Sequence, residues 1–222
     1  MKIWKYFGRR SKLSPKEKKA GTIEQIAIFG YADAPVKSTL FQQVKDVTKI
    51  LAEAGYTVVD GGGSGVMRAA TLGAKDGGGK VIGVTLEVED IPHFEGRDPR
   101  NLFDKEIKTK NYIERTLTLL KEGQVYVIFN GGTGTISEFG MAWGLARLYF
   151  GHHKPLILYG KFWKKIIKSF KDNMLLRPEE LKVYKIADDP EDVLDAIKDF
   201  EDEIERGGHN HSLKASSGGF TI

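Results

Sequence analysis

Cysteine is absent from the 222-residue chain, which excludes disulfide bonds and thiolate metal ligands. The sequence also has no apolar run of transmembrane length, and the apolar residues near its start are too few for a signal peptide. No group of His, Asp and Glu has the spacing of metal ligands. We therefore expect no metal and no membrane insertion, and the cytoplasm is the default location.

Positive charge is concentrated at one end of the chain. Residues 1–20 carry eight Lys or Arg and one Glu, whereas the other residues carry 26 basic and 29 acidic side chains, a net charge of −3. We expect a basic arm over 1–20, a folded domain over 21–206 and a flexible tail over 207–222. A solvated extension is the simplest interpretation of the arm, and weak anchoring to a membrane surface or nucleic acid is the alternative. The slightly acidic body argues against a nucleic-acid partner.

Strand-like and helix-like segments alternate between the two ends. Apolar residues at three- and four-residue spacing lie between short β-branched or aromatic runs, which is typical of a parallel sheet with helices on both faces. We expect a single α/β domain with about six or seven strands. The strand-like runs are 24–30, 56–62, 80–86, 124–130, 155–160 and 183–188.

Two glycine-rich loops follow predicted strands and precede predicted helices. Such loops let a ligand approach the backbone, and the free amides of the next helix favour an anion. Each loop alone is equally well explained by tight strand–helix packing. Neither has the Gly-Lys-Ser/Thr of ATPases or the dinucleotide fingerprint, so a nucleoside monophosphate fits better than a triphosphate. The loops are "DGGGSG" at 60–65 and "NGGTGT" at 130–135.

The two loops together carry a resemblance to a known family. "GGGSGVMRAATLGA" (61–74) followed by "NGGTGTISE" (130–138) resembles the LOG (Lonely Guy) family, often labelled possible lysine decarboxylases. The similarity extends over nearly all of 23–200. It implies a Rossmann-like doubly wound fold, a homodimer, no cofactor, and hydrolysis of the N-glycosidic bond of nucleoside 5′-monophosphates such as AMP. A pyridoxal-dependent decarboxylase is disfavoured, because no lysine has a Schiff-base context.

The resemblance also implies site residues. Glu138 matches the family's motif glutamate and Arg115 its helix arginine, so both are predicted to act on the reacting sugar, the phosphate or the base. The predicted phosphate-binding residues are Gly131, Gly132, Thr133, Gly134 and Thr135. The predicted upstream nucleotide-binding loop comprises Gly61, Gly62, Gly63, Gly65 and Met67.

Three positions depart from the family pattern. Asn130 replaces a proline, Thr116 replaces the lysine after the arginine, and Tyr31 follows Gly30 where relatives place Gly-Ser. Thr116 removes one cation. The further possible ligand contacts are Gly30, Tyr31, Arg97 and Asn101.

Three functions are therefore compared. The first is a phosphoribohydrolase that releases the base. The second is a protein of the same fold that binds a nucleotide or nucleotide-bearing cofactor without cleaving it, which the missing lysine favours. The third is a scaffolding dimer that uses the basic arm. The run 139–150, apolar on more than one face, supports a homodimer.

Overall fold

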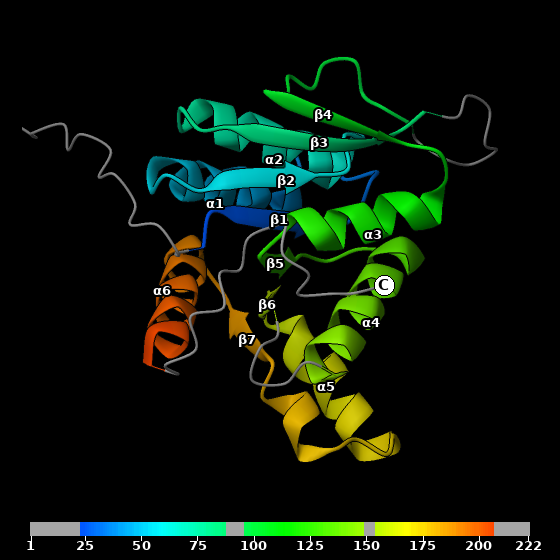
Figure 1. Ribbon diagram of the computed structural model, residues 1–222, viewed down its shortest axis with the longest axis vertical. Helices are drawn as coiled ribbons and strands as arrows, with labels where there is room; N and C mark the ends of the chain where they lie inside the picture. Colours follow the sequence, from blue (N-terminus) through cyan, green and yellow to red (C-terminus); the bar gives the residue numbers. More distant parts are fainter. Residues whose placement is uncertain (1–22, 88–95, 149–153, 207–222) are drawn as a thin grey trace, which may run out of the picture.

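The computed structural model describes residues 23–87, 96–148 and 154–206, so the predicted arm and tail lie outside the described residues. The described chain forms one α/β domain whose seven strands make a single parallel sheet (Figure 1). The strands are β1 (Gln25–Phe29), β2 (Thr57–Asp60), β3 (Val81–Leu86), β4 (Lys105–Thr109), β5 (Val125–Ile128), β6 (Leu156–Tyr159) and β7 (Tyr184–Ala187). The helices are α1 (Thr39–Glu53), α2 (Gly65–Asp76), α3 (Tyr112–Glu122), α4 (Thr133–Leu148), α5 (Phe162–Asn173) and α6 (Pro190–Arg206), with a short 3-10 helix at Pro178–Leu181.

The strand order is β4-β3-β2-β1-β5-β6-β7, with β1 at the point where the order reverses. β1 pairs with both β2 and β5, so that Ile26 is the register partner of Val58 on one side and Val125 on the other. In doubly wound sheets, ligands bind beyond the carboxyl ends of the strands at such a switch point. The loops that follow β1 and β5 therefore border the expected binding position, and the predicted Rossmann-like fold is confirmed.

Helices cover both faces of the sheet, as Figure 1 shows. On one face, the apolar sides of α1, α2 and α6 pack against alternate residues of the central strands. On the other, α3, α4 and α5 pack against the remaining strand residues, including Phe29, Tyr126 and Ile128. β5 and β6 are buried over their whole length, because a covered parallel sheet leaves no face to water.

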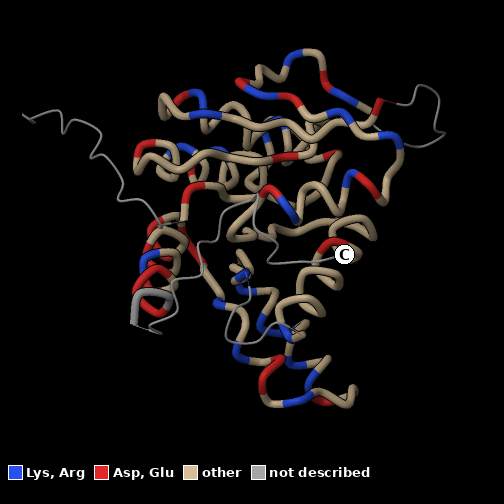
Figure 2. Tube along the Cα trace, in the orientation of Figure 1, with Lys and Arg blue, Asp and Glu red and all other residues tan. Residues whose placement is uncertain are grey.

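Strand β4 is the element that the sequence pattern did not reveal. Its sequence, KEIKT, is largely exposed, and its charged residues lie at the edge of the sheet (Figure 2). Charged side chains are typical of edge strands, where they discourage pairing with another chain.

Among the helices of the described ranges, none combines the length and apolar composition that a bilayer span requires.

Candidate functional site

A cavity of about 220 Å³ opens at the carboxyl ends of β1, β2 and β5. Its walls come from the β1–α1 loop, the β2–α2 loop, helix α3 and the start of α4, so segments far apart in sequence meet at the switch point. The structure brings together most of the residues predicted for the site. The predicted residues that line the cavity are Gly30, Tyr31, Gly61, Met67, Arg115, Gly132, Thr133, Gly134, Thr135 and Glu138.

The β5–α4 loop presents backbone amides to the cavity. The Ile136 amide makes the first hydrogen bond of α4, to the Gly132 carbonyl at 3.0 Å, so the three preceding amides lack an acceptor within the helix. A Cβ on Gly132 would meet nothing within 4 Å, whereas one on Gly131 would lie 2.2 Å from Thr135 Oγ1. Gly131 therefore serves local packing, and Gly132 faces open space. The positive end of the α4 dipole reinforces the amides as an anion site.

Glu138 lies one turn further along α4. Because residues three apart share a helix face, Glu138 and Thr135 both point toward the cavity while Phe139 packs into the core. The Glu138 side chain is only 9% exposed. A carboxylate at this position lies one turn from the amides at the start of α4 and is shielded from bulk water.

Helix α3 is fixed at both ends. At its start, the Asn111 side chain caps the helix by accepting a hydrogen bond from the Glu114 amide at 2.9 Å. At its end, the buried ammonium group of Lys154 donates to the carbonyls of Leu120 and Lys121, both at 2.8 Å. Burial lowers the pKa of Lys154 to about 8. Side chains on the inner face of α3 are therefore presented in one position.

Arg115 lies on the inner face of α3 and lines the cavity. It is 4% exposed, and its Nε donates to the Val84 carbonyl at 3.1 Å while Nη2 donates to the Gly61 carbonyl at 2.8 Å. Nη2 also lies 3.2 Å from Met67 Sδ. A Cβ on Gly61 would lie 1.8 Å from the guanidinium, so only glycine leaves room for it. Backbone carbonyls thus orient the arginine at the cavity wall.

The β2–α2 loop satisfies its own amides. The Gly62 amide donates to Asp60 Oδ1 at 2.7 Å, and the Gly63 amide contacts Met67 Sδ at 3.3 Å. At the start of α2, the Val66 amide donates to the Tyr31 carbonyl at 3.0 Å. These three amides therefore have acceptors within the protein, and nucleotide binding by this loop stays a prediction.

Asp60 anchors that loop from the end of β2. Besides the Gly62 amide, it accepts a hydrogen bond from Thr71 Oγ1 at 2.9 Å. Its side chain is fully buried, and burial raises its pKa to about 6 despite these hydrogen bonds and the nearby Arg115. This carboxylate is a structural tie between the loop and α2.

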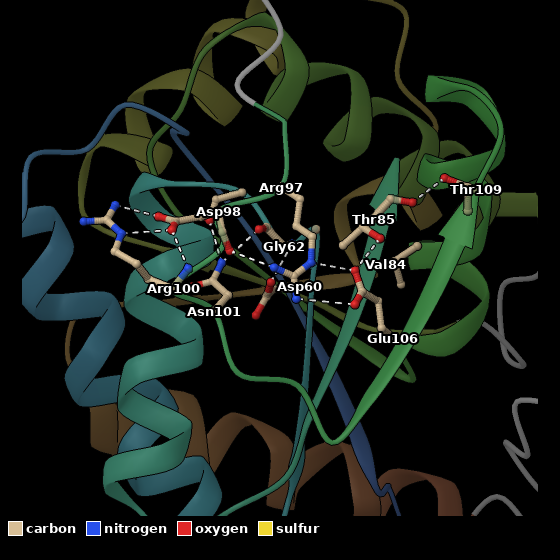
Figure 3. A network of polar contacts seen from close by, with 12 residues as sticks. Asp60, Gly62, Val84, Thr85, Arg97, Asp98, Arg100, Asn101, Glu106 and Thr109 are labelled. Atoms are coloured by element: carbon tan, nitrogen blue, oxygen red, sulfur yellow. Dashed lines mark hydrogen bonds and ion pairs between the residues drawn. The ribbon is translucent and has the colours of Figure 1, made fainter. Parts of the chain in front are cut away.

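A segment over residues 96–101 covers the outer side of the same loop (Figure 3). The buried Asn101 amide donates to the carbonyls of Gly62 and Gly63 at 2.9 and 2.8 Å. The Arg97 guanidinium donates to Glu106 on β4 at 2.8 Å. Neither Asn101 nor Arg97 lines the cavity. Asn101 supports the loop, whereas Arg97 connects this segment to β4.

Among the cavity-lining residues that sequence reasoning missed, two carry a polar or ionisable side chain, Tyr112 and Asp33. Tyr112 begins α3, and its hydroxyl lies 3.3 Å from the position that a Cβ on Gly134 would take. Burial and, after it, the Glu138 carboxylate raise its pKa. The sequence could have indicated Tyr112, because it lies three residues before Arg115 and that spacing puts both side chains on one helix face.

The family departures have clear structural consequences. Thr116 is buried, and its hydroxyl donates to the Tyr112 carbonyl at 3.0 Å, so it does not line the cavity. Among the described residues that do, Arg115 is the only Lys or Arg, against the two carboxylates of Asp33 and Glu138. Tyr31 is 43% exposed at the rim.

No group of three His, Asp or Glu in the described ranges is arranged to hold a metal ion.

Comparison with known proteins gives relatives of several kinds. A cytokinin riboside 5′-monophosphate phosphoribohydrolase of Mycobacterium tuberculosis is 26% identical over 172 residues, which cover 74% of this chain and 89% of the relative. The structure of a molybdenum cofactor binding protein from Rippkaea orientalis superposes with a TM-score of 0.59 at 23% identity, covering 80% of this chain and 97% of that one. The molybdenum cofactor carrier protein of Chlamydomonas reinhardtii gives a TM-score of 0.57 at 23% identity, with the same coverage. At these identities, the two structures support the fold alone.

The model of the SLOG cluster4 family matches residues 23–181, a stretch that includes both glycine loops, Arg115 and Glu138. The chain therefore belongs to the SLOG cluster4 family, and the LOG-like relationship predicted from its glycine motifs is confirmed.

Proposed function

We propose that the protein hydrolyses the N-glycosidic bond of a nucleoside 5′-monophosphate, releasing the free base and ribose 5-phosphate. One observation carries the proposal: the start of α4 offers amides that have no acceptor within the helix and, one turn later, the shielded Glu138 carboxylate to the same cavity. Phosphate and ribose are adjacent in a nucleotide, so one helix can engage both.

The phosphate would bind at the amides of Thr133, Gly134 and Thr135. These donors are neutral, and the helix dipole supplies the favourable potential for an anion. The two threonine hydroxyls are further donors to the phosphate oxygens. The open space over Gly132 gives the phosphate access to the backbone.

Glu138 would then face the sugar. In the reaction, water adds to C1′ as the C1′–N bond breaks, and the bonding electrons leave with the base, which takes up a proton. Positive charge develops on the ribose in the transition state. A carboxylate fixed nearby stabilises this charge and positions the water, and its removal typically costs on the order of 10²–10³ in rate.

Arg115 would bind the leaving base or the nucleotide from the opposite wall. A planar guanidinium suits flat acceptors better than an ammonium group does. Its contacts with Val84 and Gly61 hold it ready before the ligand arrives, which reduces the entropy lost on binding.

The alternative is a nucleotide- or cofactor-binding protein that does not cleave its ligand. Thr116 in place of the family lysine favours it, because the cavity lining carries a single cation. A structural relative named as a molybdenum cofactor carrier protein is consistent with a binding role for this fold. In both cases the cytoplasm remains the proposed location.

A homodimer is a further part of the proposal. Phe139 packs into the core, yet the outer side of α4 also faces an apolar groove with Ile136, Trp143 and Met174 in its walls. Ile136 and Met174 are 43% and 53% exposed. A second copy covering this groove would remove that surface from water. Light scattering at micromolar concentration should give the mass of a dimer, and a monomer mass would contradict it.

Incubation with AMP, GMP, CMP and UMP, followed by chromatography, tests the reaction directly. We expect free base from at least one nucleotide, and a roughly 10²–10³-fold slower release in Glu138→Gln. Glu53→Gln, at the far end of α1, is a matched control that should retain the full rate. Tight nucleotide binding without base release would support the carrier alternative, and the absence of any nucleotide binding would contradict both.

A further inference from the structure

Tyr112 lies where two helices begin side by side. Figure 1 shows α3 and α4 starting next to each other at the carboxyl edge of the sheet. The Asn111 cap fixes the first turn of α3, and Tyr112 is its first residue. Its hydroxyl lies 3.3 Å from the Cβ position of Gly134, and both residues line the cavity. The phenol is therefore beside the backbone amides proposed to bind phosphate.

The charges in the cavity explain why such a donor matters. A phosphate monoester carries nearly two negative charges at neutral pH. Among the residues that the structure describes, the lining has one Lys or Arg, Arg115, and two carboxylates, Asp33 and Glu138, so these side chains alone do not favour an anion. Neutral donors must supply most of the favourable interactions with the phosphate.

The Tyr112 hydroxyl keeps its proton over the physiological range. Burial first, and then the Glu138 carboxylate, raise its pKa, while Arg115 and side-chain hydrogen bonds with Thr116 and Ser137 act in the opposite direction. A protonated phenol can donate to a phosphate oxygen but does not repel it, as a phenolate would.

We propose that Tyr112 donates a hydrogen bond to the 5′-phosphate and so discriminates phosphorylated from unphosphorylated ligands. The phenol supplies, from the start of α3, a donor to a site whose lysine position is occupied by Thr116. The inference rests on the proposed function only in requiring that the cavity binds a phosphorylated sugar, and it does not require catalysis.

Glu138 is the competing acceptor for the same hydroxyl. If Tyr112 acted by positioning that carboxylate, its loss would slow base release and leave the affinity for phosphate unchanged. The two roles are therefore separated by binding measurements with ligands that differ in the phosphate group.

Calorimetric titration with ribose 5-phosphate and with adenosine provides the test. Ribose 5-phosphate lacks the N-glycosidic bond and so cannot be cleaved, whereas adenosine keeps that bond but lacks the 5′-phosphate. For Tyr112→Phe we expect the Kd of ribose 5-phosphate to rise roughly tenfold, as for a lost hydrogen bond to a charged group. The Kd of adenosine should change less than about twofold. Tyr184→Phe, on the distant edge strand β7, is the matched control and should bind both ligands like the wild type.

The outcomes are distinct. Equal changes for both ligands, or unchanged ribose 5-phosphate affinity, would overturn the role of Tyr112 while leaving the proposed function in place. A wild-type protein that binds ribose 5-phosphate without hydrolysing any nucleotide would refute the proposed reaction but not this inference. Failure of the wild type to bind ribose 5-phosphate or AMP would overturn both.

Discussion

The two glycine loops have similar sequences and opposite relations to the cavity. In the β2–α2 loop, the amides of Gly62, Gly63 and Val66 donate to acceptors inside the protein. In the β5–α4 loop, the amides before Ile136 have no acceptor within the helix and face the opening. The first loop therefore builds the wall, and the second supplies donors.

The difference shows that glycine content alone does not identify a phosphate site. The β2–α2 loop needs its glycines because neighbouring groups approach closely: Arg115 crosses Gly61, and the Ala32 carbonyl lies against Gly65. The β5–α4 loop has open space over Gly132. What a Cβ would meet is thus the feature that separates a packing glycine from a binding one.

The largest expected effect comes from substituting one glycine in each loop. Gly65 has φ of +57°, and a Cβ there would lie 2.2 Å from the Ala32 carbonyl oxygen. We expect Gly65→Ala to lower the free energy of unfolding by about 4 kcal/mol. Gly132→Ala should cost less than about 1 kcal/mol but weaken ribose 5-phosphate binding, because the new methyl group fills open space.

Urea denaturation and calorimetry measure both quantities. The comparison of the loops would fail if Gly132→Ala were the more destabilising variant, or if Gly65→Ala kept wild-type stability.

A smaller effect is expected from pH. The pKa of Asp60 is raised by burial from 3.8 to about 6, so between these values the folded protein holds a proton that the unfolded chain has released. The contribution of Asp60 to the free energy of unfolding should therefore fall by about 2 kcal/mol as the pH rises from 4 to 6.5. Asp60→Asn lacks this titration.

The measurement is the difference in unfolding free energy between the wild type and Asp60→Asn, taken at several pH values. Using the difference removes the contributions of other carboxylates, which titrate in both proteins. A difference that stays constant from pH 4 to 6.5 would show that burial in the folded protein does not raise the pKa of Asp60.

Most of the fold could be predicted from the sequence, because six strands are short apolar runs, most of which end in Gly, Asp or Asn. β4 could not, since Lys105, Glu106 and Lys108 resemble a solvated loop until β3 is present to pair with them. Its pairing depends on a neighbour about twenty residues away, and local propensity does not contain that information.

The candidate site was predictable where the motif and the cavity coincide. Glu138 and Arg115 face the cavity as the family pattern implies, although their chemical roles remain predictions. Asn101 was predicted to be near the ligand, but its hydrogen bonds to Gly62 and Gly63 make it a support. Tyr112 was missed because its importance depends on where α4 begins, and sequence spacing does not give that distance.

The hydrogen bonds from the Arg115 guanidinium to two main-chain carbonyls have a practical consequence for redesign. A lysine cannot reproduce that planar fork, so Arg115→Lys would leave at least one of the two carbonyls, from β3 and the β2–α2 loop, without its donor. Redesign of the cavity should therefore leave Arg115 untouched and vary the exposed rim at Tyr31, where new side chains meet solvent.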